Sequence, residues 1–185
     1  MAVVLGSEWC HNLAHLITSN WIDKPMDQIR IQAGMPRCIY HEINDKDVTS
    51  RQHIARSLGG PIISLLLLPV TGLMRTLTKP DSIAGETAKT AFQTNLFLSL
   101  VSLLPIPGID GGAILKWSLV DRGKKVEDAD QVVQKTNGPL AVLLGLFSSW
   151  AFLSTKILLG FFSLMLGVTS LSIFTGWLKE EDVKI

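Results

Sequence analysis

The sequence is poor in cysteine and almost balanced in charge. Its two cysteines, Cys10 and Cys38, are too few for a disulfide framework. Lysine and arginine number 17 against 16 aspartate and glutamate residues, so nothing in the net charge favours nucleic acid as a partner. The first residues lack a basic segment and a small-residue cleavage site, so we expect no signal peptide. We also find no internal repeat and no low-complexity segment.

Long apolar runs are abundant, and polar connectors separate them. Hydrophobic residues make up 47% of the chain, and a helix needs about 20 apolar residues to span a bilayer. The first run, residues 1–18, is short for a span. The pattern predicts an all-α polytopic membrane protein with about five apolar helical segments. We expect these segments at residues 2–19, 58–77, 90–104, 140–155 and 157–177.

The polar connectors complete the expected organisation. In the polar loop 20–57, residues 28–32 alternate in the strand period and residues 38–43 do so more weakly, which predicts a small β-hairpin. In the run 58–77, Gly59 and Gly60 favour close helix packing, with Pro61 expected in the first helical turn. The predicted division is a membrane core (1–120), a second polar loop (121–137), a C-terminal helical hairpin (138–178) and a charged tail (179–185).

Basic residues are concentrated in two of these loops. Lysine and arginine favour the cytoplasmic side of a membrane. Loop 20–57 carries six of them and loop 121–137 carries four, whereas the intervening loop 78–89 carries two. Two predicted crossings separate the two basic loops. The sequence therefore predicts an integral membrane protein, in contact with the lipid bilayer, that has both basic loops in the cytoplasm.

The most informative segment is residues 102–112. It leaves an apolar run, passes Pro105 and Pro107, and reaches Asp110, which two glycines follow. An ionisable side chain at membrane depth costs at least about 2.5–3.5 kcal/mol, so it is a functional-site hypothesis by default. Backbone broken by proline and glycine is tolerated there only inside protein or along a wet cavity. Asp110 is therefore expected to have a partner elsewhere in the chain.

The first predicted helix has a polar face. Glu8, His11 and His15 are spaced three and four residues apart, so they lie along one side of the helix. A buried imidazole or carboxylate needs a partner, and Asp110 is the obvious distant one. In the zinc motif H-E-x-x-H, two histidines bind the metal and the glutamate is the general base. Here Glu8 and the second histidine, His11, are in place, but Ser7 stands at the first histidine.

Three stretches together resemble the site-2 protease family, the intramembrane zinc metalloproteases. Residues 7–14 resemble the zinc helix of the family, H-E-x-G-H-A-L-A. Residues 58–65 are similar to its small-Gly-Pro-x-x-Asn segment, with Ser64 in the asparagine position. Residues 102–112 match N-L-L-P-x-P-x-L-D-G-G, with Ser102 in the asparagine position. The resemblance covers about residues 2–120, and the last motif is the most specific of the three.

The resemblance implies a set of functional residues. The zinc ligands would be His11 and Asp110, and the general base would be Glu8. The segments that bind substrate or support the site would contribute Ser64, Ser102, Pro105 and Gly111. Family members use zinc to cleave transmembrane helices of partner proteins. This chain departs from the pattern at Ser7, Ser64 and Ser102, and the spanning helix that usually precedes the zinc helix is missing from it.

Several alternatives remain open at the site. His11 and Asp110 could form a buried hydrogen-bonded pair that holds two helices together without metal. His15 could replace the missing ligand, because His11 and His15 are also four residues apart, although Glu8 would then lie a turn before the pair. A second metal site in the first polar loop is disfavoured, because its candidates have no standard zinc spacing. Those candidates are Cys38, His41, Glu42 and His53.

Two functions compete on these grounds. In the first, the chain is a pseudoprotease that binds or regulates transmembrane partner proteins without cutting them. In the second, it is an active zinc metalloprotease with an unusual set of ligands. Ser7 decides between them, because a neutral hydroxyl is a poor replacement for imidazole as a zinc ligand, and it favours the first.

Overall fold

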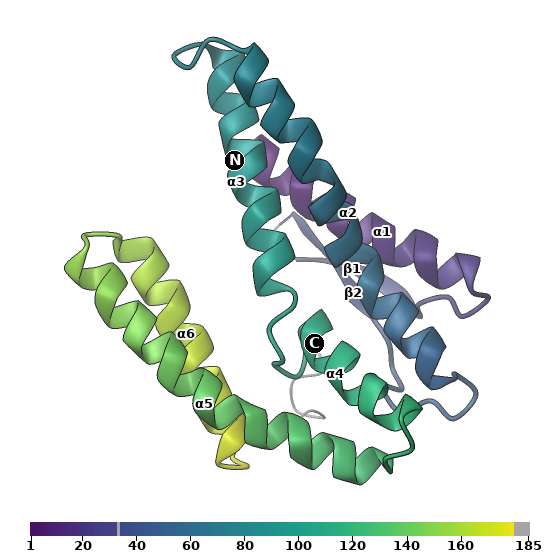
Figure 1. Ribbon diagram of the computed structural model, residues 1–185. Coiled ribbons are helices and arrows are strands. Elements are labelled where there is room, and N and C mark those ends of the chain that lie inside the picture. The colour runs from purple at the N-terminus through teal and green to yellow at the C-terminus, as the bar shows by residue number, and fades with distance from the viewer. Residues whose placement is uncertain (33, 180–185) are drawn as a thin grey trace. The chain divides into compact units, whose positions relative to one another are not determined.

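The computed structural model describes residues 1–32 and 34–179, and this part of the chain is mostly helical (Figure 1). It contains six helices and one two-stranded sheet. The chain divides into two compact units, Met1–Leu104 and Pro105–Ile185, with three of the helices in each. The expectation of a helical chain with a small hairpin is confirmed. The predicted charged tail lies outside the described residues from position 180 onward.

Three helices build the first unit. Helices α2 (Ser50–Leu77) and α3 (Ile83–Val101) pack against each other and diverge away from the turn that joins them, and α1 (Ala2–Trp21) packs against both (Figure 1). Small residues allow α2 to approach α1 closely. A Cβ atom added at Gly59 would lie 2.8 Å from the backbone oxygen of Ala14. The glycine pair at 59–60 therefore sets the distance between these two helices.

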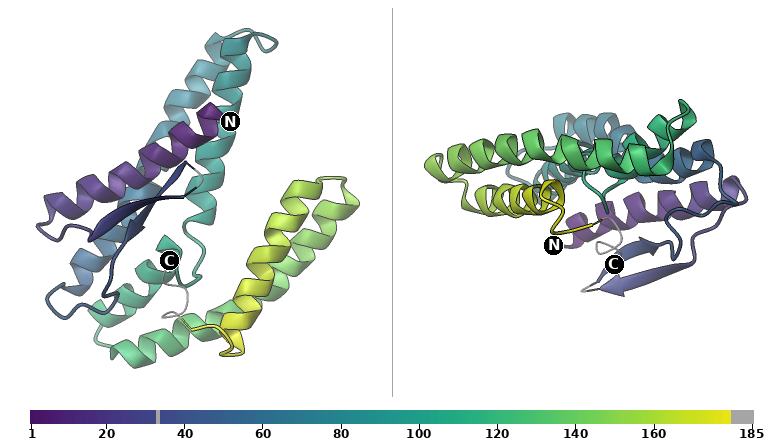
Figure 2. Two further views of the ribbon diagram at one scale, coloured as in Figure 1. Left: turned by 180° about the vertical axis from the view of Figure 1, so that it is seen from behind. Right: turned by 90° about the horizontal axis from the view of Figure 1, so that it is seen from below.

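A short antiparallel hairpin covers α1. Strand β1 (Gln28–Gln32) pairs with β2 (Met35–Ile39), and β2 contacts α1 (Figure 2). The second strand was expected at residues 38–43, which is wrong, because the chain reverses earlier through Gly34 at φ +82°. Pro36 therefore lies within β2, opposite Ile31. A two-stranded sheet has only edge strands, and these tolerate proline.

Helix α2 begins eight residues before the predicted start. Thr49 caps it with a capping box, in which the Thr49 hydroxyl accepts from the Gln52 N–H and the Gln52 side chain accepts from the Thr49 N–H. Pro61 consequently lies inside the helix and not in its first turn. The first two turns of α2 bury His53 and Arg56 in the region that was predicted to be polar loop.

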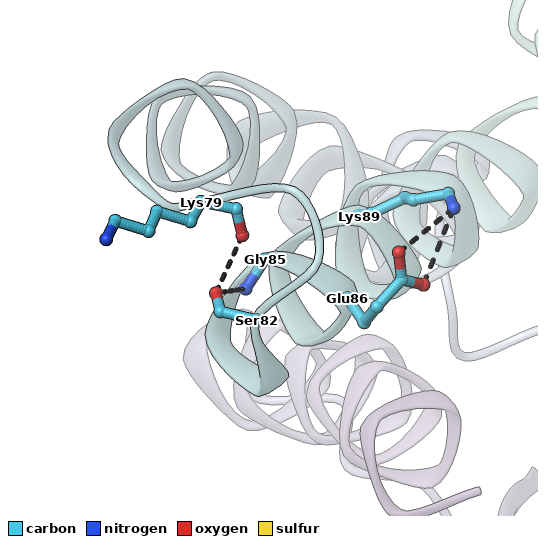
Figure 3. A network of polar contacts seen from close by, with 5 residues as sticks. All are labelled: Lys79, Ser82, Gly85, Glu86 and Lys89. Carbon is cyan, nitrogen blue, oxygen red and sulfur yellow. Dashed lines mark hydrogen bonds and ion pairs between the residues drawn. The ribbon is translucent and has the colours of Figure 1, made fainter.

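The turn between α2 and α3 is also tighter than expected. Ser82 caps α3, because its hydroxyl accepts from the Gly85 N–H at 3.0 Å and donates to the Lys79 carbonyl oxygen at 2.7 Å (Figure 3). A side chain at Gly85 would collide with the Lys79 carbonyl. One turn further on, Lys89 pairs with Glu86 at 3.2 Å. Helix α3 thus starts at Ile83 and not at residue 90, and it ends at Val101.

The second unit consists of α4 (Asp110–Asp121), α5 (Val126–Leu153) and α6 (Ile157–Phe174). Helices α5 and α6 form a hairpin through residues 154–156. The Ser148 hydroxyl links them by donating to the Gly160 carbonyl oxygen at 2.9 Å. Helix α4 packs against the first half of α5. Its 12 residues make it too short to span a bilayer.

The segment expected to be a polar loop at residues 121–137 is largely helical, since α5 begins at Val126. Ala129, Val133 and Asn137 lie four residues apart and are all buried, so they form one inward face of this helix. The many charged residues around them occupy the other faces. The high charge of this segment suggested a loop, whereas its spacing is that of an amphipathic helix.

Three of the described helices are long and apolar enough to cross a membrane, namely α2, α5 and α6. The predicted count of about five apolar segments is not confirmed. Helices α1 and α3 carry buried polar side chains, among them His11, His15 and Asn95. The prediction of an integral membrane protein is supported by these three helices.

Candidate metal centre

One face of α1 is both polar and buried. Ser7, His11, His15 and Ser19 follow one another at intervals of four residues, and each is at most 7% exposed. Residues at this spacing stack along one side of a helix. Buried polar groups are costly unless they are hydrogen-bonded. Each of the two histidines has a hydrogen-bond partner on α2.

His15 is oriented by the backbone of α2. Its Nδ1 atom lies 2.7 Å from the carbonyl oxygen of Arg56, and a carbonyl can only accept a hydrogen bond. Nδ1 therefore carries the proton, and Nε2 of the neutral ring presents a lone pair. Metal-binding histidines are commonly held by this kind of contact, in which the second ring nitrogen donates to a backbone carbonyl.

His11 faces His15 and is held by a serine. Its Nδ1 atom lies 3.0 Å from Oγ of Ser64, which is fully buried. The Nε2 atoms of His11 and His15 are 3.3 Å apart, and the two rings meet nearly edge to face at 74°. Two nitrogen ligands at about 2.0–2.1 Å from one tetrahedral zinc ion would be separated by about 3.3 Å. The observed pair therefore has the spacing of two ligands of one ion.

Gly60 lets the two imidazoles approach the backbone of α2 closely. A Cβ atom added at Gly60 would collide with Nε2 of both His11 and His15. A side chain at this position would therefore displace both candidate ligand atoms. The spacing of the two nitrogens fits a bound metal ion.

The same histidines can also satisfy each other without metal. In that arrangement the Ser64 hydroxyl donates to His11 Nδ1, and His11 Nε2–H donates to His15 Nε2. When metal binds, His11 Nδ1–H must donate to the Ser64 oxygen instead. A serine hydroxyl can act in either direction, so Ser64 is compatible with both forms.

The position of the missing first ligand is filled by other polar groups. The Ser7 hydroxyl accepts a hydrogen bond from Nδ2 of Asn95 on α3 at 3.3 Å. Asn95 is 2% exposed and also donates to the Ala91 carbonyl. Its Oδ1 atom is buried without a hydrogen-bond partner among the residues that the structure describes. Asn95 was not identified from the sequence, although it is an amide that directly precedes the apolar stretch 96–98 of α3.

Glu8, the candidate general base, lies on α1 beside this face. Burial raises the pKa of its carboxyl above the ordinary value of 4.5, and the nearby His11 and Arg37 oppose that rise. If His11 and His15 are the ligand pair, the H-E-x-x-H frame shifts by four residues and its glutamate position falls on Asn12. The Asn12 side chain donates to the Glu8 carbonyl at 3.0 Å and lies 3.5 Å from the Cys38 sulfur.

The other predicted site residues lie further along the chain. Ser102 caps the C-terminus of α3 and is 8% exposed. Pro105, Asp110 and Gly111 belong to the second unit, where Asp110 is the first residue of α4. The structure thus brings His11, His15 and Ser64 together within the first unit. The ligand role of Asp110 remains a prediction.

Two of the candidates for a second metal site, His53 and Cys38, make other contacts. The His53 Nδ1 atom accepts from the Arg56 guanidinium at 2.8 Å, and that guanidinium stacks on Tyr40 at 4.1 Å. Cys38 contacts Asn12 on α1. These contacts fasten the polar segment after the hairpin to α1 and α2, which is a structural role.

Comparison with known proteins adds two similarities, while no family model matches the chain. A protein of Methanocaldococcus jannaschii named "Putative zinc metalloprotease" is 36% identical over 62 residues. This match covers 34% of the present chain and 32% of that relative, so it spans about a third of the relative's length.

A solved structure extends the likeness to nearly the whole chain. The site-2 protease from Methanocaldococcus jannaschii superimposes with a TM-score of 0.58 at 22% sequence identity. The superposition covers 94% of the present chain and 76% of the other. The chain therefore has the fold of a site-2 protease, and its resemblance to the site-2 protease family is confirmed.

Proposed function

We propose that this protein is a zinc-binding membrane protein that binds transmembrane segments of partner proteins and has weakened proteolytic activity. His11 and His15 hold the metal, and Asp110 is the third ligand. The observation that carries this proposal is the histidine pair, whose Nε2 atoms lie 3.3 Å apart where both rings pack against Gly60. The role of Asp110 rests on the motif at residues 102–112.

The weakness of proteolysis follows from the position of the base. In H-E-x-x-H the glutamate directly follows the first ligand. When His11 and His15 are the ligands, that position holds Asn12, a neutral amide that cannot accept a proton from water. Glu8 lies almost one helical turn before His11. A zinc ion at such a site supplies Lewis acidity for hydrolysis of a peptide bond, but the base is displaced.

The partner class follows from the fold and from the membrane helices. The named relatives are a site-2 protease and a zinc metalloprotease, and three helices here are apolar enough to span a bilayer. Transmembrane helices of other proteins are therefore the proposed ligands. Ser64, Ser102, Pro105 and Gly111 are proposed to support the site or the bound segment, and the basic segments 20–57 and 121–137 are proposed to be cytoplasmic.

An active metalloprotease is the second candidate function. It is favoured by the half-buried Glu8 carboxyl, which lies three residues before His11 and so on the same side of α1. A carboxylate in this position could act as the base if the bound substrate brings it into line. The two candidate functions differ in whether the natural protein cleaves a transmembrane substrate.

A cleavage assay with two repaired variants tests the proposal. The variant Asn12→Glu places a glutamate directly after His11, whereas Ser7→His restores the original frame around Glu8. We expect little or no cleavage of a single-span model substrate by the natural protein in liposomes. Asn12→Glu should raise cleavage more than Ser7→His, because it places the general base directly after the first ligand of the pair His11 and His15.

Two results of this assay would contradict the proposal. If Ser7→His raises cleavage and Asn12→Glu does not, the natural zinc ligands would be His11 and Asp110, and His15 would not be a ligand. Robust cleavage by the natural protein that disappears in Glu8→Gln would establish the second candidate and refute weakened proteolysis. A variant with both Asn12→Glu and His15→Ala is the matched control and should be inactive.

A further inference from the structure

The orientation of Asp110 depends on the turn that precedes α4. This turn passes through Pro105, Pro107 and Gly108, the last at φ +83°. Each proline fixes its own φ near −65°. Because this turn has few rotatable backbone bonds, a contact that fixes its first residue also restricts the position of its last residue. What holds residue 105 therefore also affects where α4 begins.

The turn is packed onto the first residues of α4. Ile106 is 1% exposed, and its carbonyl oxygen accepts from the Ile109 N–H at 3.0 Å. A side chain at Gly112 would collide with that same carbonyl, so the turn and the helix touch through backbone alone. The Gly112 N–H in turn donates to the Ile109 carbonyl oxygen at 3.0 Å. The turn and the first turn of α4 consequently move together.

A buried amide on α5 holds the start of this turn. Asn137 is fully buried, and its Nδ2 atom donates to the Pro105 carbonyl oxygen at 2.9 Å and to the Val133 carbonyl oxygen at 2.8 Å. Both protons of the amide are thus used. One of them ties the turn before Asp110 to the backbone of α5.

A second link lies beyond Asp110. Lys116 on α4 is 1% exposed, and its Nζ atom lies 2.6 Å from a carboxylate oxygen of Asp130 on α5. In sequence, Asp110 lies between the two links, five residues after Pro105 and six before Lys116. Helix α5 therefore fixes both sides of the segment that carries the carboxylate.

We infer that Asn137 is a positioning residue, which holds the Asp110 carboxylate in the orientation for metal binding through its hydrogen bond to Pro105. This inference rests on the proposed function, in which Asp110 is a zinc ligand. Residues that orient a metal ligand typically contribute about 10–100-fold to metal affinity. The sequence motif ends at residue 112, so Asn137 lies outside it.

Zinc affinity of the full-length protein in detergent tests this role. Asn137→Leu keeps the approximate volume of the side chain and removes both donors. We expect zinc affinity, measured by competition with a chelator, to fall about 10-fold or more. In an Asp110→Ala background the same substitution should change affinity less than about 2-fold, because no carboxylate remains to be positioned. The visible spectrum of bound Co²⁺ should change with Asn137→Leu in the natural background.

Two further variants distinguish the positioning of Asp110 from a general loss of protein stability. Ser148→Ala removes a hydrogen bond from the same helix to another backbone carbonyl, also 2.9 Å long, and should leave zinc affinity unchanged. Asn137→Ala removes the amide donors without adding volume, which provides a second test if Asn137→Leu does not fold. It should lower affinity as Asn137→Leu does.

Each contrary result has a distinct meaning. If the natural protein binds zinc and neither Asn137 variant weakens binding, this inference is wrong and the proposed metal site stands. Equal losses of affinity in the natural and Asp110→Ala backgrounds would also overturn it. If the natural protein binds no zinc, both the proposed metal site and the role of Asn137 are refuted.

Discussion

At the scale of single residues, the direction of one hydrogen bond separates a metal site from a plain histidine pair. His15 has its Nδ1 proton fixed by the Arg56 carbonyl. His11 has no such constraint, because the Ser64 hydroxyl can donate to its Nδ1 or accept from it. The Ser64 contact is therefore compatible with both arrangements of the His11 ring protons.

Gly60 provides the first prediction at this scale. A methyl group at Gly60 would occupy the space beside both Nε2 atoms. Gly60→Ala should therefore abolish zinc binding and cost about 1–3 kcal/mol of stability through overpacking. Zinc content and the thermal unfolding midpoint in detergent would be measured on the same preparation.

A second glycine of α2 supplies the control for this prediction. A methyl group at Gly72 would lie at an ordinary contact distance, 3.5 Å, from the Phe92 ring. Gly72→Ala should keep zinc binding and should not lower stability. If Gly60→Ala bound zinc as well as Gly72→Ala does, the ion could not lie beside the histidine pair.

At the scale of helices and strands, the polar face of α1 was predictable and its partners were not. The spacing of Glu8, His11 and His15 was enough to place them on one helix. The contacts from Ser64 and from the Arg56 carbonyl depend on how α2 packs, and local sequence carries no such information. Ser64 was identified through the family pattern, whereas Asn95 and Asn137 were missed.

The ends of the helices were the least predictable feature of the fold. Helices α2, α3 and α5 all start earlier than expected, and the first turn of each contains at least one charged residue. Polarity was interpreted as loop, although Thr49 with Gln52 forms a capping box that marks a helix start in the sequence. The buried series Ala129, Val133 and Asn137 likewise has helical spacing. The capping residues would have corrected the start of α2, and the four-residue period would have corrected the start of α5.

At the scale of the whole molecule, the fold likeness extends well beyond the motifs. The resemblance drawn from the motifs covers about residues 2–120, whereas the superposition on the site-2 protease covers 94% of the chain. The three membrane-spanning candidates include α5 and α6, which lie after the last motif. Fold and membrane character thus persist where the sequence pattern of the family is no longer evident.

Membrane topology gives a prediction for the whole chain. Three exposed lysines, Lys46, Lys79 and Lys124, mark the three connecting segments. With Cys10 and Cys38 replaced, single cysteines at positions 46 and 124 should react with an impermeant reagent from the cytoplasmic side. A cysteine at position 79 should react from the other side. Labelling of positions 46 and 124 from opposite sides would refute the proposed orientation.

The zinc content of the purified protein tests the central proposal most directly. Zinc would be quantified by elemental analysis in the natural protein and in His11→Ala, His15→Ala and Asp110→Ala, each checked for folding by circular dichroism. The proposed ligand set predicts about one zinc ion per chain in the natural protein and a strong loss in each variant. Full zinc content in folded His15→Ala, or no zinc in the natural protein, would contradict it.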